Sequence, residues 1–308
     1  MRLSIYSPKS GNENQYRIIM PLPNYLDFDS AWDYSHPDQT EGRFREILLN
    51  TPEEHPAFLE LLTQIARAQG LQGKFDGAHQ TLDQVENRIG DNPSRPKVRY
   101  LLERGRVLNS SGKPEDSRSY FEQALDLATQ LAEDSYAIDA IHMLAIVSPP
   151  ASGLDLNLRA IQLAESSVQE KARGWLGSLY NNTGWSYHNM GDYESALDMF
   201  QKAESARRSK GDVNEIRIAA WAVARALRSL KRVEEALSKQ LALKTEFEQA
   251  GEADGYVFEE IGECLLALNR VEEAGLYFAQ AHEVLSQDAW LAENEPARLR
   301  RLKELGAK

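Results

Sequence analysis

Residues 180–203 read YNNTGWSYHNMGDYESALDMFQKA, and this stretch holds two helical patterns separated by a turn. The turn is marked by Gly191–Asp192, since glycine readily breaks a helix. Aromatic and small residues recur at three- to four-residue spacing before and after it: Tyr180, Gly184, Tyr187, Ala196 and Phe200. The stretch therefore predicts two helices joined by a tight turn.

The same pattern returns along the chain with a period of about 39 residues. A column of small residues repeats at intervals of 39, 40, 39, 40 and 38: Ala66, Gly105, Ala145, Gly184, Ala224 and Gly262. Twelve residues after each lies a second column: Ala78, Ser117, Asn157, Ala196, Ala236 and Ala274. Four residues further lies a third, mostly of large side chains: Leu82, Phe121, Ile161, Phe200, Gln240 and Phe278. Six matches at so regular a spacing indicate internal repetition.

Each repeat is expected to form a pair of helices, with its small residue where the two helices approach and the large residue filling the space beside it. Helix-breaking residues lie within repeats and between them, at Gly73, Gly112–Pro114, Ser148–Gly153, Gly191–Asp192, Gly90–Pro93, Gly211–Asp212 and Gly251. No alternating β-branched run interrupts the pattern. We therefore predict an all-α fold, an α-α solenoid in which each pair buries its face against the next.

The spacing resembles that of the tetratricopeptide repeat, whose signature places an aromatic residue, Gly, Tyr, Ala and Phe in this order. The closest matches are Tyr180, Gly184, Tyr187, Ala196 and Phe200, followed by Phe258, Gly262, Ala274 and Phe278. Asn157 and Gln240 depart from the signature, and the period exceeds the usual 34 residues by about five. The resemblance is thus to a long-helix variant. It implies a right-handed superhelix of about six helix pairs, an architecture used mainly for protein interaction.

The repeats divide the chain into three parts. Residues 1–58 are expected to be an N-terminal extension and cap, with one short helix around Phe44, Ile47 and Leu48. Residues 59–289 hold six repeats, which begin near residues 59, 98, 138, 177, 217 and 255. Residues 290–308 are expected to form a C-terminal capping helix, because Leu299, Leu302 and Leu305 share one helix face.

The composition excludes several classes of protein. The 308 residues carry a net charge of -12, which argues against a general nucleic-acid binder, because phosphate contacts need clustered Lys and Arg. A single cysteine, Cys264, excludes an internal disulfide framework. No apolar run is long enough to span a membrane, and the N-terminal residues lack the apolar core of a signal peptide. We expect a cytoplasmic protein with no membrane association.

No catalytic constellation is recognisable, so we expect a protein that is not an enzyme and uses no cofactor or metal. The six histidines show no metal-ligand spacing. Cys264 lies beside Leu265 and Leu266, next to the small column, which favours a packed thiol over a nucleophile. Ser111–Pro114 resembles a phosphate loop only faintly, since Val107 and Pro114 replace the required glycine and hydroxyl residue.

The resemblance implies that the first helix of each repeat lines the concave face. The residue after each small one then forms an inner column: Arg67, Arg106, Ile146, Trp185, Arg225 and Glu263. Arg, Trp and Asn are favoured at binding surfaces, because they offer planar hydrogen bonds and large contact areas. We predict a peptide-binding groove formed by Asn181, Trp185, His188, Trp221, Arg225 and Arg228, together with Arg106 and Arg67. The opposing interpretation is that the arginines pair with acids of the adjacent repeat and the tryptophans pack between repeats.

The leading functional hypothesis is a scaffold or adaptor that binds an extended peptide or an acidic protein segment in this groove. The alternative is a regulatory protein that senses a ligand or peptide and changes the shape of the solenoid. An RNA-binding role is disfavoured because the inner column is not a regular code. The expected partner is another protein or peptide, and self-association through the end faces of the solenoid stays open.

Overall fold

The computed structural model describes Phe28 and residues 31–307, which divide into two compact units, residues 1–92 and 93–308. Half of the predicted N-terminal extension and cap, residues 1–27 and 29–30, lies outside the described residues. The first unit contains α1 (Pro37–Leu49), α2 (Ala57–Leu71) and α3 (Phe75–Glu86). The second contains α4 (Arg95–Ser110), α5 (Pro114–Gln130), α6 (Asp134–Ile146), α7 (Pro150–Ser166), α8 (Glu170–Arg173), α9 (Leu176–Asn189), α10 (Tyr193–Lys210), α11 (Val213–Ser229), α12 (Val233–Gln249), α13 (Gly255–Ala267), α14 (Val271–Leu285), α15 (Ala289–Asn294) and α16 (Pro296–Gly306).

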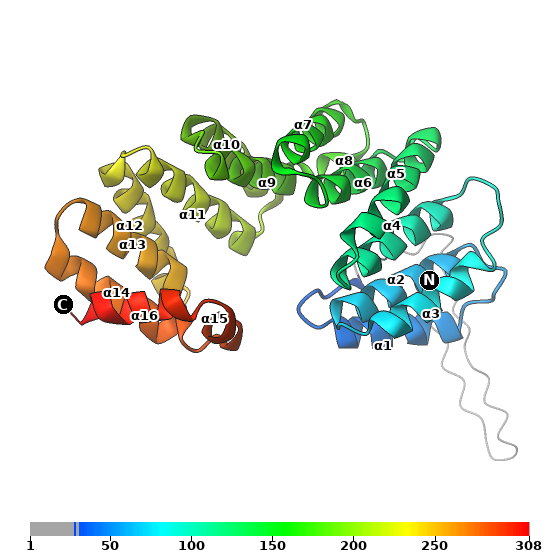
Figure 1. The fold of residues 1–308 in the computed structure, drawn as a ribbon, viewed down its shortest axis with the longest axis horizontal. Helices are drawn as coiled ribbons and strands as arrows, with labels where there is room; N and C mark the ends of the chain where they lie inside the picture. The colour runs from blue at the N-terminus through cyan, green and yellow to red at the C-terminus, as the bar shows by residue number, and fades with distance from the viewer. Residues whose placement is uncertain (1–27, 29–30, 308) are drawn as a thin grey trace, which may run out of the picture. The chain divides into compact units, whose positions relative to one another are not determined.

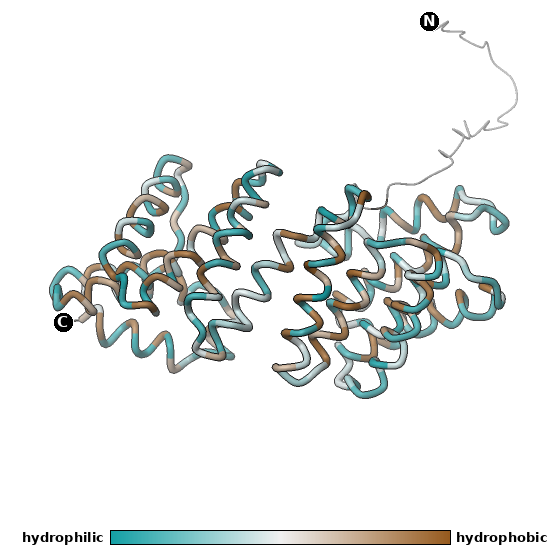
Figure 2. Tube along the Cα trace, turned by 90° about the horizontal axis from the view of Figure 1, so that it is seen from above, coloured by the Kyte–Doolittle hydropathy of each residue, from teal (hydrophilic) through white to brown (hydrophobic). Residues whose placement is uncertain are grey.

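The described part of the chain contains helices and no strand, which confirms the all-α prediction. In the second unit each long helix contacts the next one along the chain, from α4 to α14 and then α16. Figure 1 shows α5, α7 and α10 on the outer side of this unit and α6, α9 and α11 on the inner side. Hydrophilic and hydrophobic residues are interspersed along the helices (Figure 2), as expected for pairs that bury one face by stacking.

Local residues determine where these helices begin. The side chains of Asp192, Asp212 and Asp254 accept hydrogen bonds from backbone N–H groups in the first turns of α10, α11 and α13. Proline occupies the first turn of α4, α5, α7 and α16, where a missing N–H costs nothing. Gly191, between α9 and α10, has a φ of 83°, which glycine adopts without strain.

The small column lies where the helices of a pair meet, as the sequence predicts. A Cβ added to Gly184 would lie 2.5 Å from the ring of Phe200, a contact that no side chain tolerates. Gly105 and Phe121, and Gly262 and Phe278, repeat the arrangement at 2.4 and 2.8 Å. These phenylalanine rings are fully buried, so each ring fills the space that its glycine leaves.

Gln240 is an exception within this packing. It occupies the ring position of the α11–α12 pair and is completely buried. Among the described residues, neither its amide nitrogen nor its amide oxygen has a hydrogen-bond partner. A buried amide without partners destabilises a fold, because it has lost its bonds to water without replacing them.

Helices cover the apolar surface at both ends of the described chain. In the first unit, Phe44 of α1 is fully buried and packs with Phe28 and Leu61. At the other end, α16 (Pro296–Gly306) lies within the segment expected to be a cap, residues 290–308, and its Leu302 is fully buried. No helix within the described residues is both long enough and apolar enough to cross a lipid bilayer.

Candidate functional site

The predicted site residues occupy three separate places. Arg67 lies on α2 of the first unit, with its guanidinium 5.7 Å from the ring centroids of both Trp32 and Tyr34. Arg106 lies on α4 and forms ion pairs with Glu103 and Asp139. The other six lie on two neighbouring first helices: Asn181, Trp185 and His188 on α9, and Trp221, Arg225 and Arg228 on α11.

Trp185 and Trp221 form an aromatic surface between α9 and α11. Their ring centroids lie 6.1 Å apart, and both side chains are half-buried. The ring centroid of Trp185 also lies 5.0 Å from that of Phe200 and 5.3 Å from that of His188. The tryptophans therefore pack between repeats and still expose part of their rings.

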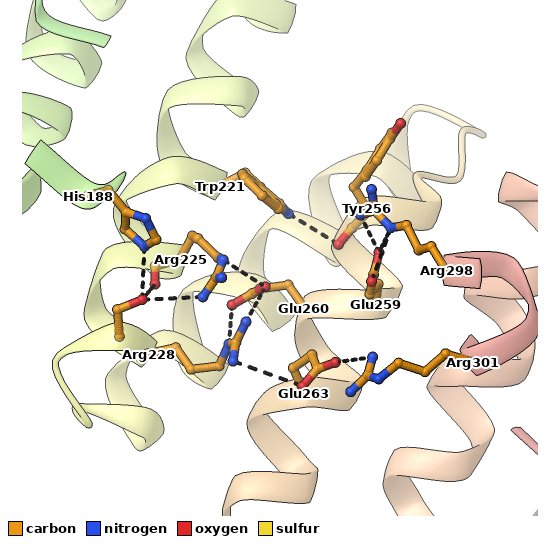
Figure 3. Close-up of polar contacts among 11 residues, drawn as sticks. His188, Trp221, Arg225, Arg228, Tyr256, Glu259, Glu260, Glu263, Arg298 and Arg301 are labelled. Carbon is orange, nitrogen blue, oxygen red and sulfur yellow. Dashed lines mark hydrogen bonds and ion pairs between the residues drawn. The ribbon is translucent and has the colours of Figure 1, made fainter. Parts of the chain in front are cut away.

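His188 connects this aromatic surface to the arginines of α11. Its Nε2 lies 2.9 Å from Ser229 Oγ, which also accepts a hydrogen bond of 3.2 Å from Arg225 Nη1 (Figure 3). Burial, followed by the positive charges of Arg225 and Arg228, lowers the pKa of His188 below its ordinary value of 6.5. The imidazole is therefore neutral at physiological pH.

Asn181 lies one turn before Trp185 on α9. Its Nδ2 donates to Asn182 Oδ1 at 3.3 Å, and its own Oδ1 is buried without a hydrogen-bond partner among the described residues. The amide oxygen is thus an acceptor that the described protein groups leave unused.

Glu260 of α13 lies opposite the two arginines of α11. Arg228 donates from Nε to Oε1 at 2.5 Å and from Nη2 to Oε2 at 3.1 Å (Figure 3). Arg225 Nε lies farther away, 3.8 Å from Oε2. Glu263, one turn later, lies 3.9 Å from Arg228 and pairs with Arg301 of α16 at 2.5 Å. We call these five residues the arginine–glutamate network; it joins α11, α13 and α16.

The arginines of the network differ in how closely they pair with acids. Burial alone would lower the pKa of Arg228, but its hydrogen bond to Glu260 and the charges of Glu260 and Glu263 raise it. Arg228 is therefore a stable, occupied cation, as is Arg106 between its two acids on α4 and α6. Arg225 is 29% exposed, and its one acidic contact among the described residues is the long one to Glu260, beside its hydrogen bond to Ser229, so it has capacity for a further partner.

A partly open apolar pocket of about 430 Å³ adjoins Trp221, between the beginnings of α11 and α13 and the end of α12. Its lining is mostly aliphatic and aromatic: Asn214, Arg217, Ile218, Trp221, Leu243, Phe247, Asp254, Tyr256 and Val257. Trp221 Nε1 donates to the backbone oxygen of Tyr256 at 3.1 Å, which fixes the indole at the pocket wall. Ile218 and Tyr256 are 52% and 37% exposed, so the pocket has an apolar rim.

Sequence reasoning found the arginines and tryptophans but missed Glu260 and the pocket residues around Tyr256. A signal for Glu260 was present two residues before the small column, where the chain has Gln64, Glu103, Met143, Asn182, Ala222 and Glu260. Of these, Glu103 and Glu260 are buried acids that pair with arginines. The pocket gave no such signal, because its residues come from three helices.

The chemistry of the described side chains gives no sign of a reactive centre. Cys264 is fully buried, and burial, followed by the charge of Glu260, raises its pKa from 9.0 to about 12, so the thiol stays protonated. This agrees with the predicted packed thiol. Within residues 31–307, no group of three His, Cys, Asp or Glu side chains is arranged to hold a metal ion.

Comparison with known sequences identifies two of the helix pairs. The family model of the tetratricopeptide repeat matches residues 98–130 and 177–210. These segments correspond to α4–α5 and α9–α10. No curated protein matches the chain.

Solved structures show the same fold at low sequence identity. The apo form of RapI has a TM-score of 0.69 and 11% identity, over 86% of this chain and 75% of its own. A signal-transduction ATPase with a tetratricopeptide repeat sensor, from Pyrococcus horikoshii, has a TM-score of 0.65 and 16% identity, over 83% and 39%. The apo form of the quorum sensor NprR from B. thuringiensis has a TM-score of 0.52 and 12% identity, over 82% and 83%.

Proposed function

Because this chain is a tetratricopeptide repeat protein, we propose that it binds a peptide or an extended segment of another protein on the surface formed by α9, α11 and α13. The observation that carries the proposal is the apolar pocket beside Trp221, whose rim residues Ile218 and Tyr256 are exposed. An apolar pocket with a few polar groups at its edge is the usual form of a binding site.

The surrounding residues supply the other contacts that a peptide needs. Trp185 and Trp221 offer rigid aromatic area, which gives binding energy at little cost in side-chain entropy. Arg225 is 29% exposed and has hydrogen-bonding capacity beyond its bond to Ser229 and its long contact to Glu260. A peptide backbone could satisfy this group, because it carries an acceptor at every residue.

The proposal is tested by selecting peptides from a random 12-residue display library against the full chain, with Trp185→Ala/Trp221→Ala as the counter-target. Peptides that occupy this surface will bind the wild type and lose about 30-fold or more in affinity for the double variant, as expected for central aromatic anchors. Circular dichroism checks that the double variant retains its helices.

Trp290→Ala provides the matched control, because Trp290 lies on α15 and is 60% exposed. The selected peptides should bind this variant as tightly as the wild type. Peptides that bind all three proteins equally would place the binding surface elsewhere. A selection that yields no binding peptide would overturn the proposal.

A sensing role is the second candidate, and the arginine–glutamate network favours it. A ligand that contacts Arg225 competes with Glu260, and Glu260 also holds Arg228. Such a ligand would change the packing of α11 against α13. The structures with the same fold include a quorum sensor, which supports the sensing role. Small-angle scattering tests it: a sensor changes its radius of gyration when the selected peptide binds, whereas a simple scaffold does not.

A further inference from the structure

The acidic charge of this chain is concentrated in one segment beside the pocket. Residues 246–295 hold thirteen Asp and Glu but one Arg and no Lys. The other 258 residues carry 34 acidic and 34 basic side chains. The net charge of -12 therefore belongs to the end of α12, to α13–α15 and to their connections.

Only part of this charge is neutralised. Seven of the acids pair with a basic group: Glu248, Glu252, Glu259, Glu260, Glu263, Glu273 and Glu295. The other six have no basic partner within 4 Å among the described residues: Glu246, Asp254, Glu272, Glu283, Asp288 and Glu293. Since an unpaired surface carboxylate adds to the local field, these six acids make the potential around residues 246–295 more negative, although α16, which packs against α14, carries Arg298, Arg300, Arg301 and Lys303.

One of these acids lines the pocket, and the backbone of a second contacts a lining residue. Asp254 is part of its lining. The backbone oxygen of Glu246 accepts a hydrogen bond of 3.2 Å from Arg217, which also lines the pocket. Burial raises the pKa of Tyr256 at the rim, and the charges of Asp288, Glu295 and Asp254 raise it further, against an opposing effect from Arg298.

The two cations near the pocket are already engaged. Arg217 is buried, stacks on Phe247 at 4.3 Å and pairs with Glu252 at 2.6 Å. Arg298 lies over the ring of Tyr256 at 4.9 Å and pairs with two glutamates. Carboxylates balance both positive charges, although Arg217 Nε is buried without a hydrogen-bond partner among the described residues. Together with Asp254, this leaves net negative charge at the pocket.

Resting on the proposed function, we infer that the partner is a basic segment: an apolar side chain that enters the pocket beside Trp221, flanked by Lys or Arg residues that face Glu246 and Asp254. The column of arginines on the first helices would suggest an acidic partner instead. Most of those arginines already have carboxylate partners, so charge complementarity favours a basic segment over an acidic one. The pocket, about 430 Å³, is large enough for a leucine or phenylalanine side chain, since whole small-molecule ligands occupy roughly 300–1,000 Å³.

Three labelled nonapeptides and fluorescence anisotropy with the full chain test the inference. The first alternates Lys with Leu and Phe, the second has Glu in place of Lys, and the third has Ser in place of Leu and Phe. The first should bind at least about tenfold more tightly than either of the others, because only it satisfies both the charge and the pocket. Its affinity should fall as salt rises from about 50 to about 300 mM, because salt screens surface charges.

Two charge variants locate the effect. Glu246→Lys should lower the affinity for the basic peptide about fivefold, which is the upper end of the range for one exposed charge pair. Glu283→Lys makes the same change on α14, where the side chain is exposed and does not line the pocket, and it should have a smaller effect. Trp221→Ala should remove most of the binding, which separates pocket binding from general attraction to an acidic surface.

The outcomes distinguish this inference from the proposed function. Tighter binding of the Glu peptide, or unchanged binding of the Lys peptide to Trp221→Ala, would overturn the basic partner. Library-selected peptides that depend on Trp185 and Trp221 but carry no basic residues would also overturn it, and the proposed function would then stand. If neither the library nor the three peptides yield binding, both proposals are wrong.

Discussion

Two pairs of successive first helices, α4–α6 and α11–α13, use arginine in opposite ways. On α4, Arg106 pairs with two acids, Glu103 and Asp139. On α11, two cations share one buried acid, Glu260. The inner column of arginines therefore contains both saturated cations and cations with spare capacity. The number of arginines on a face does not identify a binding site; the local balance of charge does.

The two regions also differ in the pockets beside them. A pocket of about 400 Å³ adjoins α6, but it lies against the second helices α5 and α7, and polar residues such as Thr129, Asp134 and Gln162 form half of its lining. The pocket beside α11 and α13 has nearly the same volume and a mostly apolar lining. Pockets of similar volume thus differ in binding chemistry, and the second is lined by two first helices, α11 and α13, together with α12.

The largest effect is expected from removing the shared acid. Glu260→Gln should lower the free energy of unfolding by roughly 3 kcal/mol, because it leaves two arginines around a neutral, buried amide. Asp139→Asn should lower it by about 1 kcal/mol, because Arg106 keeps Glu103. Urea denaturation of both variants measures the difference. Equal losses would show that the two networks are energetically equivalent.

A smaller effect of opposite sign is expected at Gln240, which occupies the position of the buried phenylalanine ring in the α11–α12 pair. Gln240→Leu should raise the free energy of unfolding by about 1–2 kcal/mol, because it replaces a buried amide without partners. Phe121 already provides an apolar side chain at the equivalent position beside α4. Gln249→Leu, at an exposed position of α12, is the control and should change stability by less than about 0.5 kcal/mol. A loss of stability in Gln240→Leu would mean that the amide makes a bond in solution.

A still smaller effect is expected at the edge of the arginine–glutamate network. Arg301 is 47% exposed, so its pair with Glu263 is screened by water. Arg301→Ala should lower the free energy of unfolding by about 0.5 kcal/mol, and the loss should shrink in high salt. A loss as large as that of Glu260→Gln would show that α16 is essential to the network.

The smallest effect is a pH dependence from His188. Its pKa is lowered by burial and by Arg225 and Arg228, so the unfolded chain binds a proton at higher pH than the folded chain does. The histidine therefore contributes stability above about pH 6.5, and this contribution is lost as the pH falls through the lowered pKa of the folded state. His188→Gln should flatten the fall in stability measured by denaturation at successive pH values from pH 7 to 5.

His142 on α6 gives the comparison with the other region. Burial lowers its pKa as well, but Asp139 opposes the shift, and Arg106 adds only a smaller lowering effect. Nuclear magnetic resonance titration should show both histidines protonating below pH 6.5. A normal titration of His188 would show that neither its burial nor the charges of Arg225 and Arg228 lower its pKa in solution.

Much of the fold was predictable because the repeat makes it local. A small residue, an alanine and a large side chain recur at fixed spacing, and the predicted contact of glycine with phenylalanine is found at Gly105, Gly184 and Gly262. The cluster of Trp185, His188, Trp221, Arg225 and Arg228 was also predictable, since residues at equal positions of successive repeats lie side by side.

The binding chemistry of that cluster was not predictable from the column. Whether an arginine is free or paired depends on a carboxylate 32 or 33 residues away, as in Arg228 with Glu260 and Arg106 with Asp139. Tyr256 and Phe247 face Trp221 across one pocket, although the three residues lie on different helices. Small differences in helix packing decide such contacts.

The sequence by itself determined the helices, their pairing and the face that each first helix presents, because helical periodicity, turn residues and a regular repeat are local physical constraints. The tertiary structure alone decided which charges are cancelled and where apolar side chains stay exposed. Electrostatic pairing and burial depend on distances between atoms of different helices, and those distances exist only after the helices have packed. The order and pairing of the helices thus follow from the local sequence, whereas the chemistry of the binding surface depends on contacts between the repeats.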